Sequence, residues 1–288
     1  MFCLQSSLWF YLEDISVGYA YPQMPNTLAV GDIMAGRPGK PLPPELESFM
    51  SASSDGVILV SFGSYLDFVP PDVARKFCDA FTDRRNRLRV IWKMRDEELC
   101  PGGRDGRLKL MRWVPQNDLL ADARVQLFIS HGGLSSIVES VYHAKPLIIF
   151  PIAFDQPTNA AAAESKGFAI RMNIGDLSPQ ALLTNVDKLL DDPSYKRNAL
   201  LASAILRDRP HTAAQRVSAI IGHVIRHGDR HLRTGAYGLS AAQFFMFDIF
   251  AVLLAAGVVV LLAVVLTCRC VYRTCCRRCC ATKKPKIA

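Results

Sequence analysis

Apolar residues follow two alternating patterns between residues 57 and 227. A continuous apolar run, as at 57–62, is typical of a parallel strand that is covered on both faces. Further strands are predicted at 88–93, 108–113, 125–130 and 146–150. Helical three- and four-residue spacing dominates the segments between and after them; these segments are 71–82, 117–121, 134–143, 157–166, 179–190, 194–207 and 212–227. Strands that alternate with helices predict an α/β fold with a doubly wound parallel sheet.

Two segments precede this pattern. Residues 20–46 contain repeated Pro and Gly, which predicts a connecting segment without regular structure. The first twelve residues are apolar but lack a basic start, and Glu13 and Asp14 follow without a small-residue cleavage site. We therefore do not expect a signal peptide there.

One further apolar segment, 249–267, holds nineteen residues without a charge. As a helix it would be roughly 28 Å long, close to the thickness of a bilayer's hydrocarbon core. A buried core helix seldom stays apolar for this length, so we predict a transmembrane helix. The cationic residues that follow place the tail in the cytosol and the body on the other side.

The charge pattern changes how the net charge of +8 is interpreted. The last acidic residue is Asp248, and seven of the 34 Lys and Arg residues lie in 269–288. The rest of the chain is nearly neutral, whereas nucleic-acid binding would need the basic excess on the folded body. We expect no nucleic-acid partner.

The nine cysteines divide in the same way, with six of them in the thirteen residues 268–280. Cys3, Cys78 and Cys100 are scattered, which indicates no disulfide framework in the body. Cysteines beside a membrane suggest S-palmitoylation, and a zinc site is the weaker alternative. Lys284 and Lys286 fit either a dilysine retrieval signal of the endoplasmic reticulum or an ordinary stop-transfer flank.

In a doubly wound fold, ligands bind beyond the carboxyl ends of the strands. The residues there are 61–64, 113–116, 131–133 and 154–156. The common nucleotide motifs G-x-G-x-x-G and G-x-x-x-x-G-K-[ST] do not follow any predicted strand. If a nucleotide binds at this edge, other residues must recognise it.

The strongest local signal is the run VQLFIS-HGG-LSSIVES at 125–140. A strand, a two-glycine turn and a helix start would aim backbone N–H groups at an anion such as phosphate, with His131 beside them. Ser135 could cap the helix or contact the phosphate. Glu139, one turn later on the same face, could accept two vicinal hydroxyls of a ribose.

Each of these residues also has a structural interpretation. His131 could be a packed histidine, Trp113 could belong to the core, and Asp155 with Gln156 could cap the next helix. HGG could also form an oxyanion hole of a hydrolase, but no G-x-S-x-G motif is present. The joint spacing of these residues favours a binding site.

That spacing resembles the UDP-glycosyltransferase family, specifically the animal UDP-glucuronosyltransferase type. The 44 residues 113–156 carry the resemblance, with WVPQNDLL at 113–120, FISHGG at 128–133, Glu139 and PIAFDQ at 151–156. It extends to KPLP at 40–43 and VSFGS at 60–64, and to HLR at 231–233 with the span and basic tail. It covers nearly the whole chain.

The resemblance implies the carboxyl-terminal, Rossmann-like half of a GT-B glycosyltransferase with one transmembrane helix. It divides the chain into an acceptor-domain remnant and linker (1–27), a UDP-sugar-binding domain (28–233), a juxtamembrane segment (234–248), the span (249–267) and a cytosolic tail (268–288). It implies a single-pass membrane protein of the endoplasmic reticulum with a lumenal body.

The resemblance also implies roles for individual residues. Trp113 would stack on uracil with Gln116 nearby, and Glu139 would hold the ribose hydroxyls. The diphosphate would lie among Ser64, His131, Gly133 and Ser135, although the family usually has Asn at position 135. Asp155 and Gln156 would bind hydroxyls of the sugar.

The resemblance implies an inverting transfer from a UDP-sugar to a small lipophilic acceptor, without a metal or another cofactor. The family's catalytic base is a histidine of the amino-terminal acceptor domain, so we expect no catalytic base in this chain. The alternative is a non-catalytic UDP-sugar-binding protein that associates with full-length glycosyltransferases. A homo- or hetero-oligomer with such enzymes is expected in either case.

Overall fold

A computed structural model describes residues 6–31, 33, 36–63, 69–95, 98, 100 and 106–281, with side chains up to Thr274. The chain forms two compact units, of which one spans Leu8–Gly228. The other comprises Asp229–Ala288 and the first seven residues. Each unit is described by itself.

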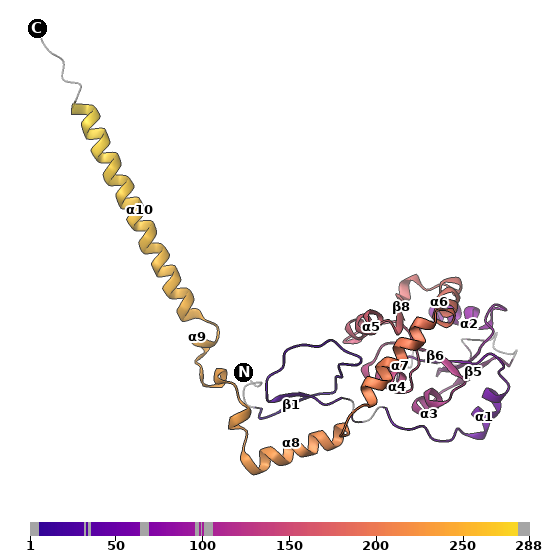
Figure 1. The fold of residues 1–288 in the computed structure, drawn as a ribbon. Helices are drawn as coiled ribbons and strands as arrows, with labels where there is room; N and C mark the ends of the chain where they lie inside the picture. The colour runs from indigo at the N-terminus through magenta and orange to yellow at the C-terminus, as the bar shows by residue number, and fades with distance from the viewer. Residues whose placement is uncertain are drawn as a thin grey trace, which may run out of the picture. The chain divides into compact units, whose positions relative to one another are not determined.

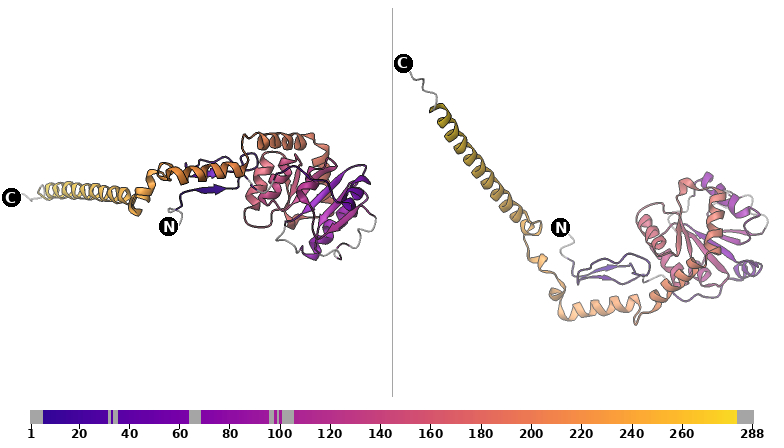
Figure 2. Two further views of the ribbon diagram at one scale, coloured as in Figure 1. Left: turned by 90° about the horizontal axis from the view of Figure 1, so that it is seen from below. Right: turned by 45° about the horizontal axis from the view of Figure 1, so that its top comes forward.

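The first unit is built around a six-stranded parallel sheet with the order β5-β4-β3-β6-β7-β8 (Figures 1 and 2). Its strands are β3 (Val57–Ser61), β4 (Arg89–Lys93), β5 (Leu108–Met111), β6 (Val125–Ser130), β7 (Leu147–Ile149) and β8 (Ala169–Arg171). From β3 the chain adds strands toward one edge of the sheet, and from β6 it adds strands toward the other edge. The parallel strands β3 and β6 pair from Val57 with Val125 to Ser61 with Ser130. This topological switch point is where open α/β sheets bind ligands.

Helices cover both faces of this sheet, as a doubly wound fold requires. One face packs against α2 (Pro71–Thr82) and α6 (Pro179–Asp191). The other packs against α1 (Pro44–Ser51), α3 (Gln116–Ala121), α4 (Leu134–Tyr142), α5 (Gln156–Ser165) and α7 (Pro193–Arg207). Successive residues of β3 alternate between the two cores, with Ile58 in the first and Leu59 in the second. The predicted fold class is confirmed.

The five predicted strands and seven predicted helices all form, with ends that differ by at most two residues. Three short strands were not predicted because three residues are too few to show a period: β1 (Trp9–Tyr11), β2 (Thr27–Ala29) and β8. The helix α1 begins at Pro44, inside the segment predicted to be irregular. Its proline occupies the first helical position, where a missing N–H costs nothing.

The amino-terminal segment of this unit forms a small parallel ribbon, in which β1 pairs with β2 from Trp9 with Thr27 to Tyr11 with Ala29. Asp14, nearly fully buried, forms an ion pair with Arg209 after α7. Lys166 Nζ donates to the Ile15 carbonyl at 3.0 Å. These contacts attach the ribbon to the body. The helix α8 (Ala213–His227) contains no buried residue.

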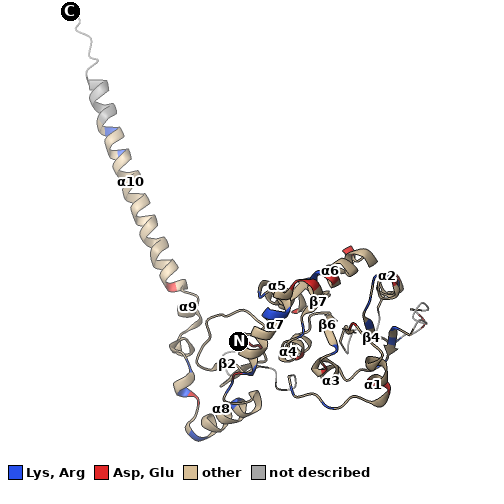
Figure 3. Cartoon of the chain, turned by 45° about the vertical axis from the view of Figure 1, so that its right-hand side comes forward, with Lys and Arg blue, Asp and Glu red and all other residues tan. Residues whose placement is uncertain are grey.

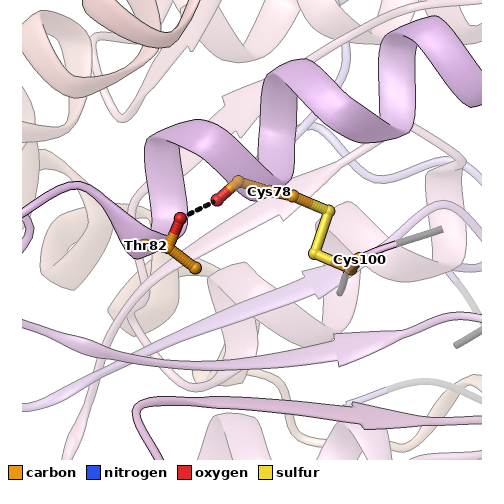
Figure 4. The surroundings of a disulfide bond; sticks show 3 residues. All are labelled: Cys78, Thr82 and Cys100. Carbon is orange, nitrogen blue, oxygen red and sulfur yellow. Dashed lines mark hydrogen bonds between the residues drawn. A yellow bond between two sulfur atoms is a disulfide. The ribbon is translucent and has the colours of Figure 1, made fainter. Parts of the chain in front are cut away.

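A disulfide joins Cys78 of α2 to Cys100 in the segment after β4 (Figure 4). The expectation of no disulfide in the body was therefore wrong. The two cysteines are 22 residues apart, and their pairing depends on how α2 packs beside β4, which spacing alone did not reveal. Thr82 Oγ1 donates to the Cys78 carbonyl at 2.8 Å and supports this end of α2.

The second unit consists of short helical turns followed by one long helix. Its elements are the 3₁₀ turns Arg230–Leu232 and Gly235–Gly238, α9 (Ala241–Phe244) and α10 (Phe247–Ala281). The first unit also contains a 3₁₀ turn, Ile174–Asp176. Residues Phe247–Thr274 are long and apolar enough to cross a membrane, by length and composition alone, and they contain the predicted span. Figure 3 shows the uncharged stretch of α10 between Asp248 and the first arginines. Lys284 and Lys286 lie outside the described residues.

Candidate functional site

A cleft of about 600 Å³ opens at the topological switch point, beyond the carboxyl ends of β3, β4 and β6. The starts of α3 and α4 form its other walls. Six of the nine residues predicted to bind the UDP-sugar line it: Trp113, Gln116, His131, Gly133, Ser135 and Glu139. The structure thus brings together residues that come from several different elements.

Trp113 supplies a flat apolar surface at the edge of this cleft. It follows β5 directly and is 69% exposed, so it is not a core residue. Lys93, the last residue of β4, places its Nζ 5.5 Å from the centroid of the Trp113 ring and donates to the Gly63 carbonyl at 2.7 Å. An exposed indole of this kind stacks well on a nucleobase.

Gln116 and Glu139 form a hydrogen-bonded pair across the cleft. Gln116 is the first residue of α3, and its Nε2 donates to Glu139 Oε2 at 2.7 Å and to Ser136 Oγ at 3.2 Å. Glu139 lies on α4 near its middle. The amide holds the carboxylate in one orientation, with the acceptor geometry that two neighbouring hydroxyls need.

His131 lies directly after β6, with its imidazole against two glycines. A Cβ atom on Gly63 would come within 2.9 Å of the ring, and one on Gly133 within 2.6 Å, so neither position tolerates a side chain without movement. Burial lowers the pKa of His131 and nearby Lys93 lowers it further, whereas Asp155 raises it. The imidazole is therefore neutral at pH 7 and can donate one hydrogen bond.

The start of α4 faces the same cleft. Gly133 is its amino-terminal cap residue and offers no side chain, so the first turn is not capped by one. The N–H groups at such a helix end carry a partial positive charge and favour an anion. With Lys93 and His131 nearby, this part of the cleft suits a diphosphate.

Asp155 and Gln156 lie beside the cleft and do not line it. Gln156 is buried, and its Oε1 accepts hydrogen bonds from the N–H groups of Ile152 at 2.8 Å and Ala153 at 3.0 Å. Asp155 Oδ2 accepts from Asn159 Nδ2 at 2.7 Å and does not cap α5. The third predicted residue that does not line the cleft, Ser64, lies outside the described residues.

Sequence reasoning missed two cationic residues that line the cleft, Arg37 and Lys93. Lys93 had a usable signal, because it ends a predicted strand at the edge where ligands bind. Arg37 lies in the proline-rich connection, and no residue pattern near it indicates that this connection passes α3. The contact is made by Asn117 of α3, whose Nδ2 donates to the Arg37 carbonyl at 3.1 Å.

Of the other histidines, His143 is part of the packing. Its Nε2 lies 3.1 Å from Asn117 Oδ1, and burial, with Lys145 and Arg207 nearby, lowers its pKa to about 4. Within the described ranges, no three His, Cys, Asp or Glu residues gather in a way that could hold a metal ion.

Together these residues can recognise each part of a nucleoside diphosphate. Trp113 offers a stacking surface, the fixed Glu139 carboxylate accepts hydroxyls, and the start of α4 with His131 and Lys93 attracts phosphates. Ser130 Oγ lies 3.5 Å from His131 Nδ1, but Ser130 is fully buried and does not line the cleft, so it is not placed to attack a bound substrate. The arrangement is the geometry of a binding site for an anionic nucleotide.

Known proteins give the same indication. The family model described as "UDP-glucoronosyl and UDP-glucosyl transferase" matches residues 2–284. The chain is 33% identical over 270 residues to 2-hydroxyacylsphingosine 1-beta-galactosyltransferase of Mus musculus, covering 93% of this chain and 49% of that protein. It is 32% identical over 266 residues to UDP-glucuronosyltransferase 2B10 of Homo sapiens, covering 92% and 49%. The chain thus spans about half the length of these relatives.

Solved structures share the fold at lower identity. A UDP-glucose: anthocyanidin 3-O-glucosyltransferase in complex with UDP superposes with a TM-score of 0.55 at 23% identity, covering 64% of this chain and 45% of that one. The glycotransferase of kitacinnamycin gives 0.55 at 23% identity, covering 68% and 49%. The body therefore has the fold of one half of a GT-B glycosyltransferase.

Proposed function

The chain belongs to the family of UDP-glucuronosyl and UDP-glucosyl transferases, and on this premise we propose that its body binds a UDP-sugar for transfer of the sugar, with inversion, to a small lipophilic acceptor. The observation that carries this proposal is the cleft at the switch point, where a stacking surface, a fixed carboxylate and an anion site line one cavity.

In this proposal Trp113 stacks on uracil, and Glu139, oriented by Gln116, accepts the two ribose hydroxyls. The diphosphate lies at the start of α4, between Gly133 and Ser135, where His131 and Lys93 face it. Ser64, which follows Gly63 in the sequence, is assigned to the diphosphate as well. Asp155 contacts the sugar directly, and Gln156 holds the loop 152–153 beside the sugar through its amide oxygen.

Inverting transfer breaks the bond between the anomeric carbon and the diphosphate while an acceptor oxygen attacks from the opposite side. Negative charge grows on the departing diphosphate. His131, Lys93 and the N–H groups of α4 are positioned to stabilise that charge, which is a large contribution in such reactions. Lys93 supplies a positive charge, and the neutral His131 and the N–H groups of α4 supply hydrogen bonds, so the proposal assigns no step to a metal ion or cofactor.

The acceptor's proton must pass to a base, which we assign to the part of the relatives that this chain does not span. Support comes from exposed apolar side chains on the amino-terminal segment and α8; they are Tyr11, Leu12, Ile15, Tyr19, Tyr21, Met24, Ile221 and Ile225. A three-residue, two-stranded parallel ribbon is not stable on its own. A second domain that covers this surface would supply the acceptor pocket.

A lipophilic acceptor is supported by Phe154. Its φ of 57° lies in the left-handed region, which is costly for a bulky side chain, and the ring is 95% exposed beside Asp155. A strained, exposed aromatic ring next to the sugar site provides an apolar surface for an incoming acceptor.

We further propose that α10 anchors the body on the lumenal side of the endoplasmic reticulum membrane. The Cys78–Cys100 disulfide is typical of an oxidising compartment. Aromatic residues flank the apolar stretch, as they do at membrane interfaces, with Phe247 and Phe250 at its start and Tyr272 near its end.

Tryptophan fluorescence tests donor binding in the chain itself, because Trp92 is fully buried and Trp113 is exposed. UDP should quench the tryptophan emission of the purified chain, and it should quench the emission of the Trp113→Phe variant only weakly. His131→Ala and Glu139→Ala should each raise the Kd for UDP about tenfold or more. A chain that is folded by circular dichroism yet binds no UDP in calorimetry would refute the proposed donor site.

The second candidate is a non-catalytic UDP-sugar-binding protein that associates with full-length glycosyltransferases. It rests on the donor cleft alone, whose described lining residues can bind a nucleotide. An immunoblot with an antibody against the basic tail separates the two. An endogenous band well above 31.9 kDa supports the enzyme. A band at that mass, with co-purification of a longer glycosyltransferase and no sugar transfer, supports the binding protein.

A further inference from the structure

A second cavity, of about 530 Å³, lies beside the donor cleft on another face of α4. Ser135 and Glu139 of α4 line the donor cleft, whereas Val138 and Tyr142 line this second cavity. Its other walls are the connection at 36–38, the end of α7 and the first turn of α8. It therefore lies where two connecting segments of the body run side by side.

The charged groups that line this cavity are all basic, namely Arg37, Arg207, Arg209 and His211. No Asp or Glu is among its described lining residues. Arg209 is paired with Asp14, whose carboxylate is not part of the lining. The side chains of Arg37 and Arg207 are both exposed at the cavity, so a ligand can reach them.

Two further features complete the site. The fifteen-residue helix α8 begins at the cavity, and its capping box uses Thr212 and Gln215. That box leaves the N–H groups of Ala213 and Ala214, which line the cavity, for a ligand anion. The opposite wall is apolar, formed by Val138, Leu206 and the Tyr142 ring. The Arg207 guanidinium lies 4.7 Å from the centroid of that ring.

We infer that this cavity is a binding site for a phosphate ester with an apolar or aromatic body, separate from the UDP-sugar site. Arginine side chains and a helix start recognise the phosphate, and the apolar wall accepts the organic part. The volume is in the range of small-molecule sites.

Arg37 lines both cavities, which connects the second site to the donor cleft. Its carbonyl is held by Asn117, the neighbour of Gln116. A ligand that draws the Arg37 side chain into the second cavity removes a positive charge from the donor cleft. A ligand in the second site should therefore raise the Kd for UDP, and bound UDP should raise the Kd for the second ligand by the same factor.

The test uses the purified full chain and phenyl phosphate as the probe, measured by calorimetry. Saturating UDP first occupies the donor cleft, so that heat from the probe reports only the second site. Bound UDP raises the Kd for the probe through Arg37 but leaves Arg207, His211 and the start of α8 to bind it, so binding must remain measurable. Binding is expected in Arg197→Gln, which changes an exposed arginine of α7 that does not line the cavity. Arg207→Gln and His211→Gln should raise the Kd for the probe, by about tenfold for the arginine.

Circular dichroism and the Kd for UDP should be the same in all three variants, which shows that they fold. Phenol, which lacks the phosphate, should not bind. The inference is overturned if phenyl phosphate does not bind to the UDP-saturated chain, if phenol binds as tightly, or if Arg207→Gln binds as well as Arg197→Gln. Failure of UDP itself to bind would instead refute the proposed donor site.

Discussion

Glu139 and Gln116 act as one unit at the residue scale, since the amide of one holds the carboxylate of the other at 2.7 Å. A ribose presents two vicinal hydroxyls to this carboxylate, whereas 2′-deoxyribose presents only one. Discrimination between the two sugars is therefore a direct measure of what Glu139 contacts.

Glu139→Gln should raise the Kd for UDP about tenfold to a hundredfold, because charge-assisted hydrogen bonds are lost. The Kd for 2′-deoxy-UDP should change much less. Calorimetry with both nucleotides measures the difference. Equal losses for the two nucleotides would show that Glu139 does not contact the ribose.

Gln116→Leu should weaken UDP binding about fivefold in the native background and leave it unchanged in Glu139→Gln. The physical reason is that Gln116 acts through the orientation of Glu139. A double-mutant cycle on the Kd for UDP measures this coupling. Additive effects of the two substitutions would instead indicate a separate contact of Gln116 with the nucleotide.

His143 makes the stability of the body depend on pH. Its pKa is about 4 in the folded chain, against about 6.5 in an unfolded chain. The stabilisation is therefore complete above pH 6.5 and is lost as the pH falls toward 4. The native chain should lose about 2 kcal/mol more unfolding free energy between pH 7 and pH 5 than His143→Gln does, as measured by urea denaturation at both pH values. Equal losses of unfolding free energy in the native chain and in His143→Gln would contradict the low pKa of His143.

At the scale of elements, the start of α4 is shaped by the imidazole that lies against it. A methyl group on Gly133 would lie 2.6 Å from His131 Nε2, so the ring or the helix start must move. Gly133→Ala should raise the Kd for UDP at least tenfold. Gly175→Ala is the matched control, since its nearest contact would be an ordinary 3.5 Å. Tight UDP binding by Gly133→Ala would show that the site does not depend on this packing.

The disulfide is a second feature at this scale, because it ties α2 to the segment that follows β4 and Lys93. It closes a loop with a sequence separation of 22 residues, for which a stabilisation of about 3 kcal/mol is expected. The double variant Cys78→Ser, Cys100→Ser should therefore melt about 6–12 °C lower than the native chain. Dithiothreitol should lower the melting temperature of the native chain and not that of the variant.

At the scale of the whole molecule, α10 should retain the chain in the membrane without contributing to the donor site. The full chain should remain in the pellet after an alkaline carbonate wash. A truncated chain of residues 1–240, which ends before α9, should be recovered in the supernatant with the same Kd for UDP. Loss of UDP binding in the truncated chain would show that the second unit supports the site.

The sequence by itself determined the strand and helix pattern of the body, since buried parallel strands must be continuously apolar and amphipathic helices must keep their period. It also determined the HGG turn and the likeness of residues 113–156 to a known family. Six of the nine predicted site residues line one cleft because each follows a strand or lies in the first two turns of a helix that begins at the same edge.

Only the tertiary structure decided which distant residues meet. Lys93 approaches Trp113, and Gln116 reaches Glu139, because the strand order β5-β4-β3-β6 places these elements side by side. Gln156 uses its amide oxygen on the loop 152–153, which no motif indicates. These contacts depend on strand order, helix packing and the path of a connection. Local periodicity carries no information about them.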